Sequence, residues 1–211
     1  MAQAIEVGLC GKGNPGYRQV NLAGVILAAG SSTRMGRPKA LLEFKGETFL
    51  HRLIGHFTNV CSEVIVVGRP DLQFPALENA KLILNPDPDR GMLSSLQCGL
   101  SAVSLQSEAV IFAPVDYAPV HRQTVVEIAQ SFNGVLTLPV FEGRRGHPCI
   151  VSRQLMQELL GLSVDESAKT VIHAHLPEAR LVPVTDSRTV EDVDEPEAYQ
   201  KLLASVAHDQ N

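Results

Sequence analysis

The stretch AGVILAAGSSTRMGRPK, from Ala23 to Lys39, decides the fold, because an apolar strand runs directly into a flexible and positively charged loop. Its first half is rich in apolar and β-branched residues, which is typical of a strand buried on both faces. The loop has neither the Walker spacing nor the G-x-G dinucleotide fingerprint. A longer loop of this kind can wrap a triphosphate, with Arg34 and Lys39 meeting its oxygens. Taken alone, the same residues also fit a solvated turn between a strand and a helix.

The rest of the chain alternates between strand and helix patterns. Runs that predict strands are GVILAA (24–29), EVIVVG (63–68), KLILN (81–85), AVIFAPVD (109–116) and GVLTLPVF (134–141), all read as buried on both faces. Helical patterns cover 48–60, 91–105 and 121–132, and Thr48 is the expected N-cap of the first. The order predicts a three-layer α/β fold with a mostly parallel sheet, which binds ligands beyond the carboxyl ends of its strands.

After Pro139 the pattern is less regular. Residues 138–152 predict a bent, Gly-rich excursion that returns as a strand, and helices are expected near 153–161 and 166–175. A late strand at 179–184 precedes the segment 190–206, whose last part is an amphipathic helix. Nothing in this region divides the chain, so we expect a flexible leader at 1–22 and one domain at 23–207.

Composition excludes several classes of function. The net charge of −5 and the pI near 5.8 argue against a nucleic-acid-binding surface, which needs a basic face. The four cysteines are far apart and form no C-x-x-C pair, which favours reduced thiols in a cytoplasm over disulfides or a zinc site. No apolar run approaches the roughly 20 residues of a membrane span. We therefore expect a soluble, cytoplasmic protein that binds neither nucleic acid nor a membrane.

Acidic residues stand where a metal site is expected. Asp116 follows the apolar strand AVIFAPV, and Asp192 and Asp194 follow the late strand with one residue between them. Mg²⁺ prefers one or two carboxylates together with substrate phosphates and water. The pair Asp192 and Asp194 fits helix capping before EPEAYQKLL equally well, so the residues alone leave both interpretations open.

Five motifs in order resemble the nucleotidyltransferases related to molybdenum cofactor cytidylyltransferase. The first is LAAGSSTRMGRPK with the following L-L and G-x-T, which meets every fixed position of the signature L-A-A-G-x-S-x-R-M-G-x-x-K. The others are NPDPDRGMLSSLQCGL (85–100), APVDYAP (113–119), RRGHPCIVS (144–152) and VEDVDEPEAY (190–199). Together they cover nearly all of residues 23–203.

The resemblance implies a Rossmann-like nucleotidyltransferase fold of the glycosyltransferase-A type and assigns the site residues. Arg34 and Lys39 are expected to be catalytic, with Asp116 and Asp194 as Mg²⁺ ligands and Asp192 left open. The acceptor is expected at Gly146, His147 and Pro148. The nucleotide is expected at Leu27, Ala28, Ala29, Gly30, Ser32, Arg34, Lys39, Asn85, Gly91, Ser95 and Asp116.

The same resemblance implies a reaction that moves a nucleoside monophosphate from an NTP to a phosphorylated acceptor and releases pyrophosphate. It favours CTP, because Ala29 stands where guanylyltransferase relatives read L-A-G-G, and molybdopterin as the acceptor. Apo-enzymes of the xanthine dehydrogenase class are the implied protein partners. Tyr117, Glu195 and the pair Asp87 and Pro88 depart from the family pattern, and these departures bear on the identity of the acceptor. The alternatives are a guanylyl-, methylerythritol-phosphate- or sugar-phosphate-transferring enzyme of the same fold, and a nucleotide-binding regulator without turnover.

Overall fold

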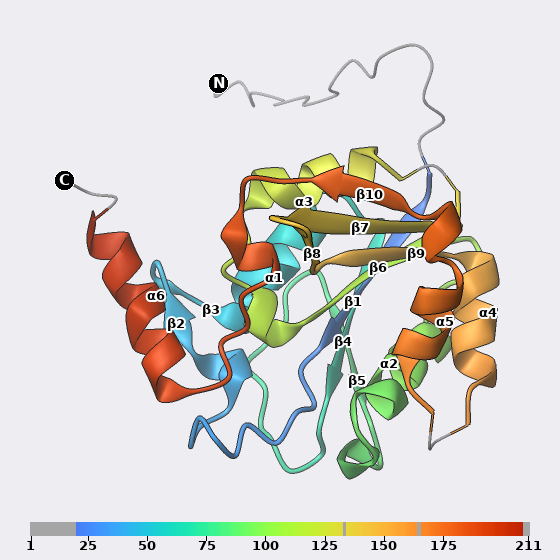
Figure 1. The fold of residues 1–211 in the computed structure, drawn as a ribbon. Coiled ribbons are helices and arrows are strands. Elements are labelled where there is room, and N and C mark those ends of the chain that lie inside the picture. The colour runs from blue at the N-terminus through green and yellow to red at the C-terminus, as the bar shows by residue number, and fades with distance from the viewer. Residues whose placement is uncertain (1–19, 133, 164–165, 209–211) are drawn as a thin grey trace, which may run out of the picture.

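The computed structural model describes residues 20–132, 134–163 and 166–208 and forms a three-layer α/β domain (Figure 1). Residues 1–19, which hold most of the predicted leader, lie outside the described residues. Leu22, which the prediction places in the leader, is already the first residue of strand β1 and is 4% exposed.

One large sheet forms the middle layer. Its eight strands include the order β10-β7-β9-β6-β1-β4-β5, with β8 paired to β7. The strands are β1 (Leu22–Leu27), β4 (Glu63–Gly68), β5 (Lys81–Leu84), β6 (Ala109–Pro114), β7 (Leu136–Phe141), β8 (Arg144–Arg145), β9 (Cys149–Ser152) and β10 (Arg180–Pro183). Neighbours are parallel except where β9 lies between β6 and β7, antiparallel to both, and where β8 pairs with β7. The prediction of a mostly parallel mixed sheet is confirmed.

Helices cover both faces of this sheet. They are α1 (Phe49–Phe57), α2 (Met92–Ser101), α3 (Arg122–Gln130), α4 (Arg153–Gly161), α5 (Ala168–Ala174) and α6 (Pro196–His208). The predicted N-cap of α1 is confirmed, because the Thr48 side chain accepts a hydrogen bond from the His51 amide. The helix expected at 153–161 is also confirmed, as α4. None of the described helices combines the length and the apolar character needed to cross a membrane.

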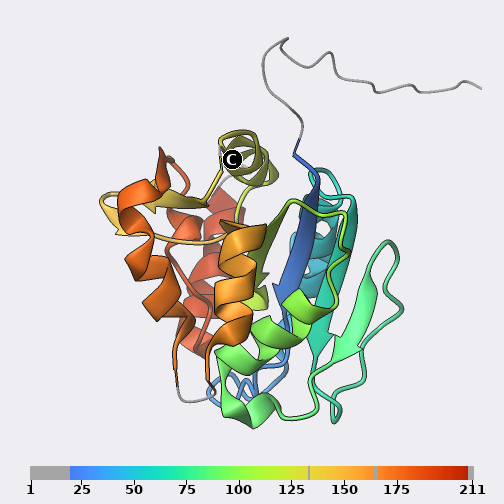
Figure 2. The ribbon, with the colours of Figure 1, turned by 90° about the vertical axis from the view of Figure 1, so that its right-hand side faces the viewer.

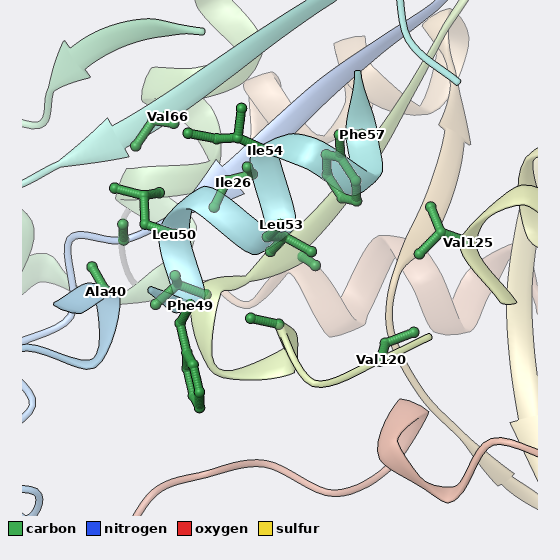
Figure 3. Packing of buried hydrophobic residues seen from close by; sticks show 14 of the residues in the cluster. Ile26, Ala40, Phe49, Leu50, Leu53, Ile54, Phe57, Val66, Val120 and Val125 are labelled. Atoms are coloured by element: carbon green, nitrogen blue, oxygen red, sulfur yellow. The ribbon is translucent and has the colours of Figure 1, made fainter. Parts of the chain in front are cut away.

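Alternate residues of the central strands divide the core into two clusters. Ile26 and its neighbours on one face pack against α1 and α3, whereas Val25 and Leu27 pack on the other face against α2, α4 and α5. Figure 3 shows part of the first cluster, including Ile26 and Val66 of the sheet and Leu50, Leu53 and Ile54 of α1. Figure 2 shows the second layer, where α2 and α4 cover the opposite face. This period-2 division is what strands buried on both faces require.

The prediction of burial on both faces is wrong for β5. This strand is the edge of the sheet, and Lys81, Leu82 and Leu84 are exposed while only Ile83 is partly buried. A run of apolar letters does not reveal whether a strand has one neighbour or two, so the sequence could not separate β5 from the central strands.

Candidate active site

A cavity of about 450 Å³ opens at the carboxyl ends of the parallel strands, where the fold predicts a ligand site. It is bounded by the ends of β1 and β6, the loop after β1, the start of α2, and Asp194. Every residue expected at the nucleotide except Asn85 lines it, namely Leu27, Ala28, Ala29, Gly30, Ser32, Arg34, Lys39, Gly91, Ser95 and Asp116. The size suits a nucleotide-sized ligand.

The loop after β1 is shaped by its own backbone. Ser32 has a positive φ of 52°, and its carbonyl accepts hydrogen bonds from the amides of Met35 and Gly36, which closes a tight turn. The Ser32 hydroxyl accepts a further hydrogen bond from the Lys39 amide at 3.1 Å. Met35 is 7% exposed and anchors the turn in the core. Ser32 therefore holds the backbone amide of Lys39 in place, and it also lines the cavity.

Lys39 lies between the two predicted metal ligands. Its ammonium donates to Asp116 Oδ2 at 2.8 Å and also to Asp194 Oδ1. Asp116 lies in the turn Val115–Tyr117 after β6, and Asp194 lies in the segment before α6. Arg34 donates to the other oxygen of Asp194 at 2.5 Å. The structure thus brings together all four residues that the motifs single out for catalysis and metal binding. Arg34 has 65% of its side chain exposed, whereas Lys39 and Asp116 have 15% and 13%.

Burial and charge act in opposite directions on these groups. Burial raises the pKa of Asp116, although the neighbouring Lys39 ammonium opposes this. The hydrogen bond from Lys39 lowers the pKa of Asp194. Burial by itself would lower the pKa of Lys39, but its two carboxylate partners outweigh burial and raise it. The cluster is therefore a charged lysine held by two carboxylates in a largely desolvated place.

The two aspartates fit a divalent cation. Both offer hard oxygen donors, and a positive charge already lies between them in the form of the Lys39 ammonium. Asp116 Oδ1 is buried and has no hydrogen-bond partner, so one buried oxygen lone pair remains available. Within the described ranges, no three His, Cys, Asp or Glu side chains gather as a metal-binding group. A site with two carboxylates relies on substrate phosphates and water for its other ligands, as Mg²⁺ sites do.

The start of α2 forms the opposite wall. Gly91 has φ of 90°, a left-handed conformation that favours glycine, and it lets the chain turn from the Pro88–Arg90 segment into the helix. Asn85 is 3% exposed and donates to the hydroxyls of Ser94 and Ser95 at 2.9 and 3.0 Å. Asn85 does not line the cavity; its side chain bonds the turn and the helix start. Its expected contact with the nucleotide stays a prediction.

The predicted acceptor residues lie beside the cavity and do not line it. The His147 ring packs 4.6 Å from the Tyr117 ring, and Tyr117 directly follows Asp116. Burial lowers the pKa of His147 to about 4, so its imidazole is neutral near pH 7. Gly146 is fixed by a close approach, because a Cβ there would lie 1.9 Å from the Thr189 carbonyl oxygen. His147 therefore offers a neutral ring near Asp116, with a buried Nδ1 that has no partner.

Other cavity residues have no separate signal in the sequence. The lining also includes Ser31, Thr33, Pro38, Ala40, Leu72, Pro88, Asp89, Met92, Pro114 and Val115. Several belong to motif segments, but Leu72 comes from the loop after β4, and only the fold brings it here. Asp192 is exposed and is not part of the lining.

Comparisons with known proteins identify the family of the chain. A family model described as the MobA-like NTP transferase domain matches residues 24–180. The molybdenum cofactor cytidylyltransferase of Escherichia coli strain K12 is 26% identical over 181 residues, which cover 83% of this chain and 92% of that protein. A probable molybdenum cofactor guanylyltransferase of Bacillus cytotoxicus is 24% identical over 59% of this chain, and the match spans only 65% of that relative's length.

The fold comparison finds the same architecture. The crystal structure of Rv0371c from Mycobacterium tuberculosis H37Rv has a TM-score of 0.74 and 23% identity, covering 89% of this chain and 100% of that one. A further structure of the mycobacterial protein is a complex with manganese, with a TM-score of 0.65, 22% identity, and coverage of 88% and 100%. These likenesses establish the nucleotidyltransferase-type fold of the chain.

Proposed function

Because the chain belongs to the MobA-like NTP transferase domain family, we propose that it transfers cytidylate from CTP to the phosphate of molybdopterin and releases pyrophosphate. The observation that carries this proposal is the Lys39 ammonium held between Asp116 and Asp194 at the mouth of a nucleotide-sized cavity. One cation in reach of two acids, with a second cation at Arg34, is a charge arrangement suited to phosphates and a metal.

The proposed roles follow from the positions of the side chains. Arg34 is mostly exposed and free to turn from Asp194 toward the triphosphate, where its planar fork matches phosphate oxygens. Lys39 exchanges its carboxylate partners for phosphate oxygens and neutralises the departing pyrophosphate. Asp116 and Asp194 hold Mg²⁺, which supplies positive charge against the reacting phosphates when bound. The manganese complex of the mycobacterial homologue supports a divalent cation in this fold.

The reaction needs no general base among these residues. A phosphate monoester has a second pKa near 6, so the acceptor is already largely a dianion at neutral pH. Its oxygen attacks the α-phosphorus, the new O–P bond forms, and the bond to the β-phosphate oxygen breaks. The chain's contribution is to position the two phosphates in line and to stabilise charge. A neutral His147 next to Tyr117 suits hydrogen bonding or stacking with a pterin ring better than pairing with a phosphate.

The choice of CTP rests on two supports. Ala29 follows the L-A-A-G reading, and the cytidylyltransferase relative matches along 92% of its length, compared with 65% for the guanylyltransferase relative. At 26% and 24% identity, GTP remains the competing donor. Apo-enzymes of the xanthine dehydrogenase class are the proposed recipients of the product.

The test is pyrophosphate release with Mg²⁺ and reduced, molybdenum-loaded molybdopterin, comparing CTP with GTP, ATP and UTP and reading the product mass in parallel. Methylerythritol phosphate and a hexose 1-phosphate serve as control acceptors. A cytosine dinucleotide product supports the full proposal, and turnover only with another acceptor discards molybdopterin. Nucleotide binding without any pyrophosphate release favours a regulator.

A matched pair of variants tests the metal ligands in the same assay. Asp194→Asn and Asp192→Asn make the same chemical change two residues apart. Asp194→Asn is expected to lower turnover by about 10²-fold or more, the scale on which one electrostatic group contributes. An equal loss in Asp192→Asn would make Asp192 part of the site, and no loss in Asp194→Asn would refute the proposed ligand pair.

A further inference from the structure

Asp194 lies on a segment that has no regular structure of its own. Residues 190–195 connect the turn at Ser187–Thr189 to α6, and Asp194 depends on what anchors this segment at its two ends. Before Asp194, Val193 is 4% exposed and packs in the core. After it, α6 lies at one side of the molecule, beside the short strands β2 (Glu43–Phe44) and β3 (Glu47–Thr48) (Figure 1).

Tyr199 is the buried anchor of α6. It is 6% exposed, whereas the other side chains of residues 196–205 are exposed or only partly buried. Its hydroxyl donates to the Glu43 carbonyl oxygen at 2.7 Å, and its ring meets the Phe49 ring edge-on with centroids 6.2 Å apart. Tyr199 does not line the cavity, so these contacts hold the helix and do not touch a ligand.

The same ring also reaches the catalytic loop. The guanidinium of Arg37 lies 5.1 Å from the Tyr199 ring centroid, within the range of a cation–π contact. Arg37 stands two residues before Lys39, and Tyr199 stands five residues after Asp194. The chain therefore closes a ring in which Lys39 meets Asp194 inside the site and Arg37 meets Tyr199 outside it. Each contact limits the movement of the other.

We propose that Tyr199 is a positioning residue for the divalent cation: it docks α6 against Glu43, Phe49 and Arg37 and thereby holds the Asp194 carboxylate opposite Asp116. This inference rests on the proposed metal site, and it predicts that a side chain outside the cavity sets metal affinity. Residues that orient a metal ligand typically change affinity by 10- to 100-fold when they are removed.

The experiment is Mn²⁺ binding, followed through the electron paramagnetic resonance signal of free Mn²⁺, with a non-hydrolysable CTP analogue present. Tyr199→Ala is expected to weaken binding about tenfold. Tyr199→Phe keeps the ring and loses only the hydroxyl bond to Glu43, so a smaller loss of about threefold is expected. Leu203→Ala, at an exposed position of the same helix, is the matched control and should bind as the wild type does. Circular dichroism checks that each variant is folded.

A second readout separates positioning from general loss of structure. In Tyr199→Ala, pyrophosphate release should fall at low Mg²⁺ and recover when Mg²⁺ is raised about tenfold, because the ligand is displaced and not removed. A folded Tyr199→Ala that binds Mn²⁺ like the wild type overturns the inference. If that variant does not fold, Tyr199→Phe decides, and unchanged Mn²⁺ affinity in it overturns the inference as well.

The outcome also distinguishes this inference from the proposed function. Loss of Mn²⁺ binding in Asp194→Asn with unchanged binding in both Tyr199 variants leaves the metal site standing and removes Tyr199 from it. Absence of Mn²⁺ binding in the wild type removes the metal site itself, and with it both proposals.

Discussion

Replacing Lys39 by methionine tests whether its ammonium substitutes for a metal between the two aspartates. The change keeps an unbranched side chain, one atom shorter, and removes its charge. Lys39 and Asp116 form an ion pair of 2.8 Å, and only 15% and 13% of their side chains are exposed. Breaking a buried pair by removing one partner costs about 3–5 kcal/mol.

The lower end of that range is expected here. Burial already raises the pKa of Asp116, so the unpaired carboxyl can take up a proton and limit the loss to about 3 kcal/mol. For a chain of this size each kcal/mol shifts the melting temperature by about 2–4 °C, which gives a fall of about 6–12 °C. Lys201→Met, at an exposed position of α6, is the control and should melt like the wild type.

Stabilisation by Mg²⁺ gives a second measurement for the Lys39→Met variant. In Lys39→Met the two carboxylates are no longer occupied by the ammonium, so Mg²⁺ should bind the free variant more tightly than the wild type. Ligand at 100 times its dissociation constant stabilises by about 2.7 kcal/mol, enough to recover most of the lost stability. Even with Mg²⁺, turnover of Lys39→Met should be about 10²- to 10³-fold lower than that of the wild type, because Lys39 also neutralises the triphosphate. Thermal unfolding with and without Mg²⁺ measures both effects. Equal stabilisation of both proteins by Mg²⁺, or an unchanged melting temperature without it, would refute the reasoning.

Three further outcomes are expected. Asp116→Ala should abolish pyrophosphate release while circular dichroism stays native, and near-wild-type activity with Mg²⁺ would show that the metal site is misassigned. Burial, followed by the neighbouring Arg52, lowers the pKa of His56 from 6.5 to about 4; the unfolded chain then binds this proton first, so urea-unfolding stability should be full above pH 6.5 and fall toward pH 4. His56→Gln should remove about 3 kcal/mol of the stability loss between pH 6.5 and pH 4, and an unchanged loss would contradict the assignment. Gly146→Ala should lower the melting temperature measurably, because its Cβ would overlap the Thr189 carbonyl oxygen; wild-type stability would mean that this contact relaxes freely.

Local sequence patterns were sufficient to predict many of the strands and helices of the fold. The burial of β1 on both faces and the cap at Thr48 each depend on neighbouring residues, and both are confirmed. The exposed edge strand β5 was missed, because its exposure depends on where it lies in the sheet order. A sequence pattern predicts which secondary structure a segment forms, but it does not predict which strands become its neighbours.

The site shows the same division. Arg34, Lys39 and Asp116 stand in motifs whose order predicts that they meet, and the structure brings them to one cavity. The ammonium of Lys39 between two carboxylates is not visible in the sequence, because its partners lie 77 and 155 residues away along the chain. Tyr199 ends the motif VEDVDEPEAY, but its anchoring role is not visible in the sequence either, since aromatic residues on amphipathic helices commonly pack in the core.

The antiparallel strand β9 affects how proteins of this architecture can diverge. Because β9 runs against β6, it starts at the ligand edge with Cys149 opposite Phe112. The preceding excursion, residues 142–148, is tied to β7 through the pairing of Arg144 and Arg145. Strand β1, which leads into the loop with Arg34 and Lys39, does not pair with β9. If the acceptor binds at Gly146, His147 and Pro148 as we propose, substitutions elsewhere in this excursion would leave the loop with Arg34 and Lys39 in place. A duplicated gene could then exchange one phosphorylated acceptor for another and keep that donor loop.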